Sequence, residues 1–177
     1  MKQWKTLLAL FLAYFIVAFP FKVMGVIPGF TDIRPVVLLG PIYAVFFGLP
    51  GCWVMALGNL VMDAVSGSLR WSSIPGFAAN FLGPWLIYLL CVRRAKKPFS
   101  LRTGRDLLKH CWILILSAAL QTVLITPAVA LLYPEVDAGL FALTVMLNDT
   151  AFPIVFGIPL MILLQEELHY QPLRRGE

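Results

Sequence analysis

The stretch that decides the fold is residues 35–65, PVVLLGPIYAVFFGLPGCWVMALGNLVMDAV. Its 31 residues carry a single charge, on Asp63. A transmembrane helix needs about 20 mainly apolar residues to cross about 30 Å of hydrocarbon. Because a Pro-Gly pair at positions 50–51 interrupts the stretch, we predict two short transmembrane helices, Pro35–Leu49 and Cys52–Val65.

The rest of the chain has the same character. Of its 177 residues, 60% are apolar and only 13% are charged, whereas about a quarter of the residues of a soluble domain are charged. The mean hydropathy is +0.85. We predict one all-α domain over residues 1–177, an integral membrane bundle of six transmembrane helices. The four further helices are Lys5–Phe21, Pro75–Val92, Cys111–Leu132 and Gly139–Leu164. The first apolar run lacks a small-x-small cleavage pattern, so we interpret it as a retained helix and not a signal peptide.

The positions of the basic residues predict the orientation of the bundle. Cytoplasmic loops are enriched in Lys and Arg. With six helices and a cytoplasmic N-terminus, the outer loops hold only Lys22, Arg34 and Arg70, and the other 11 of the 14 basic residues lie inside. Both termini are therefore predicted to be cytoplasmic, and the net charge of +5 reflects topology and not nucleic-acid binding.

Polar residues within the predicted helices, or in the case of Arg34 at the outer mouth of one, fall at a similar depth, toward the outer face. They are Arg34, Asn59, Asp63, Asn80, Asn148 and Asp149. Ionisable groups inside a membrane are costly and usually functional, and convergent polar groups in an apolar bundle are typical of a small-molecule site. The alternative is that Arg34 pairs with Asp63 or Asp149 and that the amides only hold the helices together. Gln121 and Thr126, taken singly, fit that structural role better.

Two further features concern the first helix and the loop that follows it. Ala9 and Ala13 form a small-xxx-small pattern, which allows another helix to approach closely. The loop Lys22–Arg34 contains Met24 and Phe30 among other apolar residues. We predict that it folds over bound solute as a lid; the alternative is that it packs on the end of the bundle.

The sequence lacks the motifs that identify several classes of enzyme. The chain has no Gly-Lys pair and therefore no nucleotide-binding loop of the G-x-x-x-x-G-K-[ST] type. The zinc-protease pattern H-E-x-x-H and the nucleophile pattern G-x-S-x-G are also absent. Cys52, Cys91 and Cys111 show neither metal nor disulfide spacing. We expect no cofactor, no metal and no catalytic residue.

Four short motifs carry a resemblance to a known family. They are Thr31–Pro35 (TDIRP), Phe47–Trp53 (FGLPGCW), Gly58–Asp63 (GNLVMD) and Pro75–Gly83 (PGFAANFLG). Together with the size and the predicted topology, they resemble a subgroup of the substrate-binding S components of energy-coupling factor (ECF) transporters. The likeness covers about residues 31–90, and the rest agrees only in layout.

The resemblance implies a binding subunit of the bacterial or archaeal cell membrane. It would capture a vitamin or related micronutrient from outside, and a transmembrane coupling subunit with two ATPase subunits would drive uptake. Family members carry Ala-x-x-x-Ala in helix 1 for docking on the coupling subunit, and Ala9 and Ala13 match it. Arg34 would suit an anionic or carbonyl group of the solute, and Trp71 with Phe77 would stack on a ring. Asp63 and Asp149 would suit an amine.

Two other interpretations stay open on the sequence. A cell-envelope scaffold protein similar to MreD would also be small and multi-spanning, and its buried polar groups would pair with one another. An intramembrane enzyme would use Asp63 and Asp149 as adjacent carboxylates.

Overall fold

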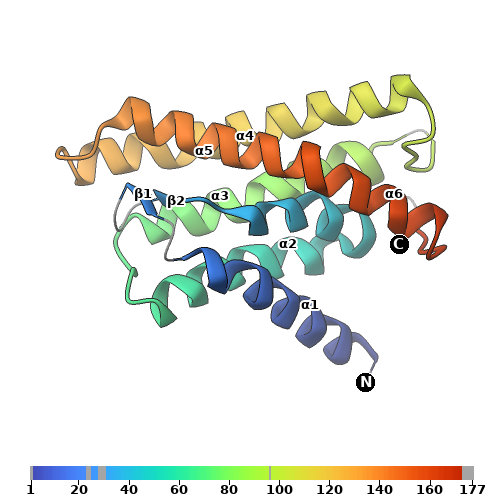
Figure 1. Ribbon diagram of the computed structural model, residues 1–177, viewed down its shortest axis with the longest axis horizontal. Helices are drawn as coiled ribbons and strands as arrows, with labels where there is room; N and C mark the ends of the chain where they lie inside the picture. The colour runs from blue at the N-terminus through green and yellow to red at the C-terminus, as the bar shows by residue number, and fades with distance from the viewer. Residues whose placement is uncertain (1, 23–24, 28–30, 96, 173–177) are drawn as a thin grey trace.

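The protein is a bundle of long helices, as a computed structural model describes it (Figure 1). The structure describes residues 2–22, 25–27, 31–95 and 97–172. In chain order the elements are α1 (Lys2–Ala18), η1 (Phe19–Phe21), β1 (Gly25–Ile27), β2 (Thr31–Asp32), η2 (Pro35–Leu38), α2 (Leu39–Val65), α3 (Ser73–Tyr88), η3 (Leu89–Arg93), α4 (Gly104–Leu132), α5 (Ala138–Phe152), η4 (Pro153–Gly157) and α6 (Ile158–Glu166).

Five helical segments are long and apolar enough to cross a membrane. They are Trp4–Phe21, Pro35–Val65, Ser73–Arg93, Gly104–Leu132 and Ala138–Glu166. This confirms the helical fold class, and it is compatible with the membrane protein that composition predicts. The last of these spans joins α5, η4 and α6 into one rod, and it runs antiparallel to α4 (Figure 1).

The span Pro35–Val65 is not a straight helix. Gly48 has φ 60° and ψ −139°, a conformation that glycine adopts far more readily than other residues. There the chain doubles back, so that two arms of α2 lie side by side (Figure 1). A Cβ atom built on Gly51 would lie 2.4 Å from the Tyr43 carbonyl oxygen. The predicted break at 50–51 therefore corresponds to a reversal centred two residues earlier.

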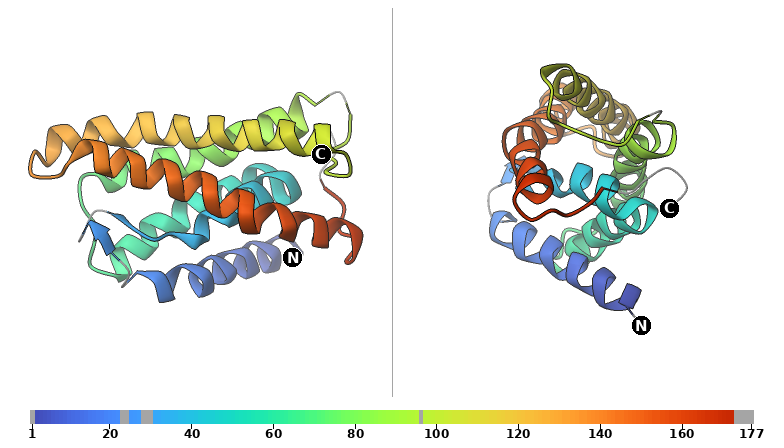
Figure 2. Two further views of the ribbon diagram at one scale, coloured as in Figure 1. Left: turned by 45° about the horizontal axis from the view of Figure 1, so that its top comes forward. Right: turned by 90° about the vertical axis from the view of Figure 1, so that its right-hand side faces the viewer.

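The bundle has two distinct ends. The end that carries β1 and β2, here called the hairpin end, also holds the α2–α3 and α4–α5 connections (Figures 1 and 2). The opposite end, here called the basic end, holds both termini and the segment that joins η3 to α4. Arg93, Arg94 and Lys97 belong to that segment or border it.

The two arms of α2 form the centre of the bundle, and α1 lies at its edge. The buried share of the most apolar 18 residues is 72% in the span Pro35–Val65 but only 17% in the span Trp4–Phe21. The inner side of α1 packs Tyr14 against Gly58, where an added Cβ would come within 2.8 Å of the ring. The hydroxyl of Tyr43 donates a hydrogen bond of 2.7 Å to the Leu10 carbonyl oxygen. Most of α1 is therefore exposed on the surface of the bundle.

One helix begins earlier than its hydrophobicity predicts. The apolar run suggested a start at Cys111, but α4 begins at Gly104. The Thr103 hydroxyl accepts a hydrogen bond of 3.1 Å from the Asp106 backbone N–H, which satisfies one of the free amides of the first turn. Capping and not hydrophobicity sets this boundary.

The loop predicted as a lid contains a small antiparallel hairpin. Gly25 pairs with Asp32 and Ile27 with Thr31, and β2 lies against α5. Met24 and Phe30, two of the apolar residues behind the lid prediction, lie outside the described residues. The lid itself stays a prediction.

Candidate functional site

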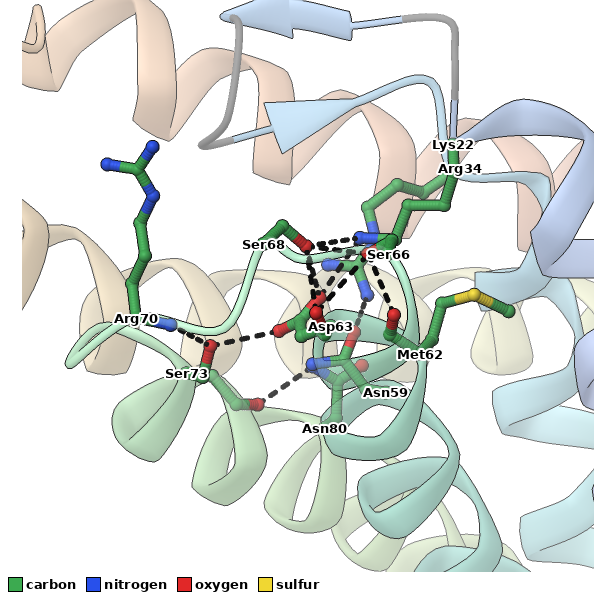
Figure 3. Close-up of polar contacts among 11 residues, drawn as sticks. Lys22, Arg34, Asn59, Met62, Asp63, Ser66, Ser68, Arg70, Ser73 and Asn80 are labelled. Atoms are coloured by element: carbon green, nitrogen blue, oxygen red, sulfur yellow. Dashed lines mark hydrogen bonds and ion pairs between the residues drawn. The ribbon is translucent and has the colours of Figure 1, made fainter.

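The two basic residues that flank the hairpin both bind one turn of α2. The Lys22 ammonium lies 3.0 Å from a carboxylate oxygen of Asp63, and the Arg34 guanidinium donates to the Asn59 side-chain oxygen (Figure 3). Asn59 and Asp63 are four residues apart, so they lie one above the other on the same helix face. The hairpin is thereby attached to α2 at both of its ends.

The carboxylate of Asp63 has a complete set of partners. Besides Lys22, it accepts a hydrogen bond of 3.0 Å from the Ser73 hydroxyl and a longer one of 3.5 Å from Ser68 (Figure 3). Ser73 is the first residue of α3, and its hydroxyl also accepts from the Arg70 backbone N–H. Asp63 therefore links the ends of α1, α2 and α3.

Asn148 and Asp149 come from the C-terminal part of α5. The Asn148 side-chain oxygen accepts a hydrogen bond of 3.3 Å from the Arg34 backbone N–H. Asp149 is only 9% exposed, and the Arg34 charge acts on it electrostatically. Within the described part of the chain, no hydrogen bond to the Asp149 carboxylate is formed, so this buried acid differs from Asp63 in lacking a direct donor.

A small cavity lies beside Asp149. Asn80, Ser117, Gln121 and Asp149 contribute its polar walls, and its volume is about 20 Å³. About 10–15 Å³ measured in this way holds one water molecule. Asn80 itself donates a hydrogen bond of 2.8 Å to the Gly76 carbonyl oxygen, one turn earlier in α3.

A second cavity lies under the hairpin, lined by Lys22, Arg34 and Asn59 together with Tyr14 and Met62. Its volume is about 10 Å³. Both cavities hold at most a water molecule or so, because the polar side chains around them mostly bind one another. Neither of these two cavities has room for a solute of vitamin size.

The structure brings together six of the seven residues predicted for solute binding. Arg34 contacts Asn59 and Asn148 directly and Asp149 through its charge. The seventh residue, Trp71, is 74% exposed in the α2–α3 connection and lines neither cavity. Phe77, also suggested to stack on a ring of the solute, lies near Trp53, with ring centroids 6.2 Å apart.

Lys22 and Ser73 were not predicted as site residues. Lys22 was counted only as an outer-loop charge, yet it is the ion-pair partner of Asp63. The available signal was a single lysine at the end of the uncharged run that follows Lys5. Ser73 gave no such signal, because serine is common at the start of a helix. Gln121, which was assigned a structural role, lines the cavity. The hydroxyl of Thr122, on the same helix, donates a hydrogen bond to the Ala118 carbonyl oxygen.

The two acids have different surroundings. Asp63 binds a lysine and two serines, whereas Asp149 faces Arg34 and a water-sized cavity. They share no hydrogen-bonding partner among the described residues. Among those residues, no cluster of three or more His, Cys, Asp or Glu side chains is arranged to hold a metal ion.

No protein-family model, curated protein or solved structure matches this chain.

Proposed function

We propose that this protein is a membrane-embedded solute-binding subunit, similar in role to the S component of an ECF transporter. The observation that carries the proposal is Asp149, a buried acid in a cavity wall that has a cation nearby and no hydrogen-bond donor among the described residues. A buried charge of this kind costs free energy unless a partner compensates it. A bound solute with an N–H or ammonium group would supply that partner.

The proposed topology is six membrane-crossing arms with both termini in the cytoplasm. The reversal at Gly48 supports it, because it divides the 31-residue span into two antiparallel arms. Lys22, Arg34 and Arg70 lie at the hairpin end, and the basic segment between η3 and α4 lies at the other end. The positive-inside rule then makes the hairpin end external.

Solute entry would require the present contacts to change. The two cavities among these residues have volumes of only about 20 and 10 Å³. In the proposed cycle the contacts from Lys22 to Asp63 and from Arg34 to Asn59 break, the hairpin lifts, and the released polar groups bind the solute. Arg34 suits a carboxylate or carbonyl oxygen, and the two acids suit an amine. The solute is accordingly proposed to be a small polar micronutrient that carries both kinds of group.

A partner in the membrane is proposed for α1. Ala9 is exposed, Ala13 is half-buried, and the neighbouring Leu8, Leu12 and Ile16 are exposed between 54% and 73%. Small residues between large ones form a groove that another helix can approach closely. A transmembrane coupling subunit with two ATPase subunits would dock here and supply the energy for uptake.

A second candidate is a cell-envelope scaffold without a solute site. The direct bonds among Lys22, Asp63, Arg34 and Asn59 favour it, since such bonds lock helices together with little empty space. In that case Asp149 would serve only the packing of α5.

The decisive experiment is mass spectrometry of small molecules that remain bound to the purified protein. The wild type and the Glu135→Gln variant should retain one compound that Asp149→Asn loses. Glu135 is an exposed acid at the same end, so its variant controls for loss of charge. If the wild type retains no compound, and a panel of vitamins fails to raise its unfolding temperature, the scaffold becomes the better description.

A further inference from the structure

An open cleft lies at the basic end, far from the polar cluster of the hairpin end. Its volume is about 420 Å³, within the range of about 300–1,000 Å³ that small-molecule sites occupy. The end of η3, the connection that follows it and the first turns of α4 form its walls. It is much larger than either cavity at the hairpin end.

The cleft is strongly positive. Arg94, Lys97 and Lys109 line it, and Asp106 is the one acid among the described residues that does. The Asp106 carboxylate already accepts a hydrogen bond of 2.7 Å from the Thr103 hydroxyl. Among the described residues, none of the three cations forms an ion pair, in contrast to Arg102 nearby, which binds Glu166 at 2.9 Å.

The base of the cleft carries a buried histidine with an unused nitrogen. His110 is 2% exposed and lines the cleft. Its Nδ1 lies 3.7 Å from the Cys91 sulfur, and its ring packs edge-on against Phe99. Its Nε2 has no hydrogen-bond partner among the described residues. When the Cys91 thiol donates to Nδ1, Nε2 carries the proton and is a free donor.

We propose that this cleft binds a phosphate group, carried either by an acidic phospholipid or by a small soluble phosphate. Three unpaired cations and a buried N–H donor match the several acceptor oxygens of a phosphate. Charge-assisted hydrogen bonds of this kind are stronger than hydrogen bonds between neutral groups. Basic pockets at the membrane surface between transmembrane helices bind phospholipid head groups in the same way. The site is independent of the proposed solute site, so either one can fail without the other.

The test uses the full-length protein in lipid nanodiscs. In nanodiscs of phosphatidylcholine with a minor fraction of phosphatidylglycerol, native mass spectrometry should find phosphatidylglycerol retained by the wild type. The double variant Lys97→Gln, Lys109→Gln should bind it about thirtyfold more weakly, since each cation near a membrane surface contributes about a factor of five. Arg105→Gln is the matched control, because Arg105 is exposed on the first turn of α4 and does not line the cleft.

A second arm separates the two sources of phosphate. In pure phosphatidylcholine nanodiscs, inorganic phosphate is compared with chloride at equal ionic strength. A phosphate-specific rise in unfolding temperature that the double variant lacks identifies a soluble phosphate. Selective retention of phosphatidylglycerol without that rise identifies a lipid. The proposal is overturned if neither ligand is preferred, or if Arg105→Gln weakens binding as much as the double variant does.

Discussion

Replacing Gly51 by alanine tests the reversal on which the candidate site depends. In one straight helix, Arg34 and Asn59, 25 residues apart, would be separated by about 37 Å at 1.5 Å per residue. They instead form a hydrogen bond, because the chain turns back at Gly48 and brings Gly51 against the backbone of Tyr43.

The magnitude follows from the geometry at Gly51. An alanine Cβ would lie 2.4 Å from the Tyr43 carbonyl oxygen and 2.8 Å from its carbon, whereas ordinary contact begins at 3.4 Å. The two arms must therefore separate by about 1 Å. Overpacking costs about 1–3 kcal/mol, and we expect the upper part of that range because backbone cannot rotate away. Alanine regains about 0.5–1 kcal/mol in a helix, which leaves a net loss of about 2 kcal/mol.

The assay is reversible unfolding of the purified protein from mild detergent into dodecyl sulfate, followed by circular dichroism. Gly104→Ala is the matched control, because a Cβ there meets nothing within 4 Å. It should leave the free energy of unfolding unchanged or raise it slightly. If Gly51→Ala is as stable as Gly104→Ala, the close contact between the two arms does not exist and the reversal at Gly48 is wrong.

Three further predictions concern the ends of α1, α2 and α5. Asp63→Asn should lower the free energy of unfolding by about 1–2 kcal/mol. This value lies between the contribution of surface ion pairs, about 0.2–1 kcal/mol, and the cost of breaking buried ones, about 3–5 kcal/mol, because the Asp63 side chain is 16% exposed. A double-mutant cycle with Lys22→Gln should show positive coupling, and additive effects would refute the ion pair. Ala13→Leu should abolish uptake in cells while solute still protects the purified protein from unfolding, if α1 docks a coupling subunit; equal loss of both would remove that role. Asp137→Ala should lower stability by about 1 kcal/mol, because the Asp137 carboxylate accepts from the Leu140 backbone N–H at 2.8 Å; an unchanged unfolding midpoint would contradict this cap.

Much of the polar cluster was predictable from residue spacing. Asn59 and Asp63 share a helix face because they are four residues apart, and alternating helix directions place Asn80, Asn148 and Asp149 at the same depth. The partners within the cluster were not predictable. That Asp63 binds Lys22 while Arg34 binds Asn59 depends on how the hairpin crosses the bundle end, which no local pattern encodes.

The amount of empty space was also beyond the sequence. A set of polar residues at one depth predicts a solute cavity and a solid, hydrogen-bonded plug equally well. The described structure has two water-sized voids, because side chains long enough to reach one another fill the space between the helices. At the basic end the sequence predicted no cavity, but the structure has one. A run of Arg and Lys predicted only an orientation, yet it lines an open cleft above His110.

The sequence alone determined that this chain is helical and that its helices are long and apolar enough to cross a membrane. Its apolar segments are too long and too poor in charge for a soluble surface, and a backbone in lipid must satisfy its own hydrogen bonds. Only the tertiary structure decided which costly polar groups compensate one another and which do not. Asp63 and Asp149 look alike in the sequence, but packing gives one of them three hydrogen-bonding partners and leaves the other beside a cavity.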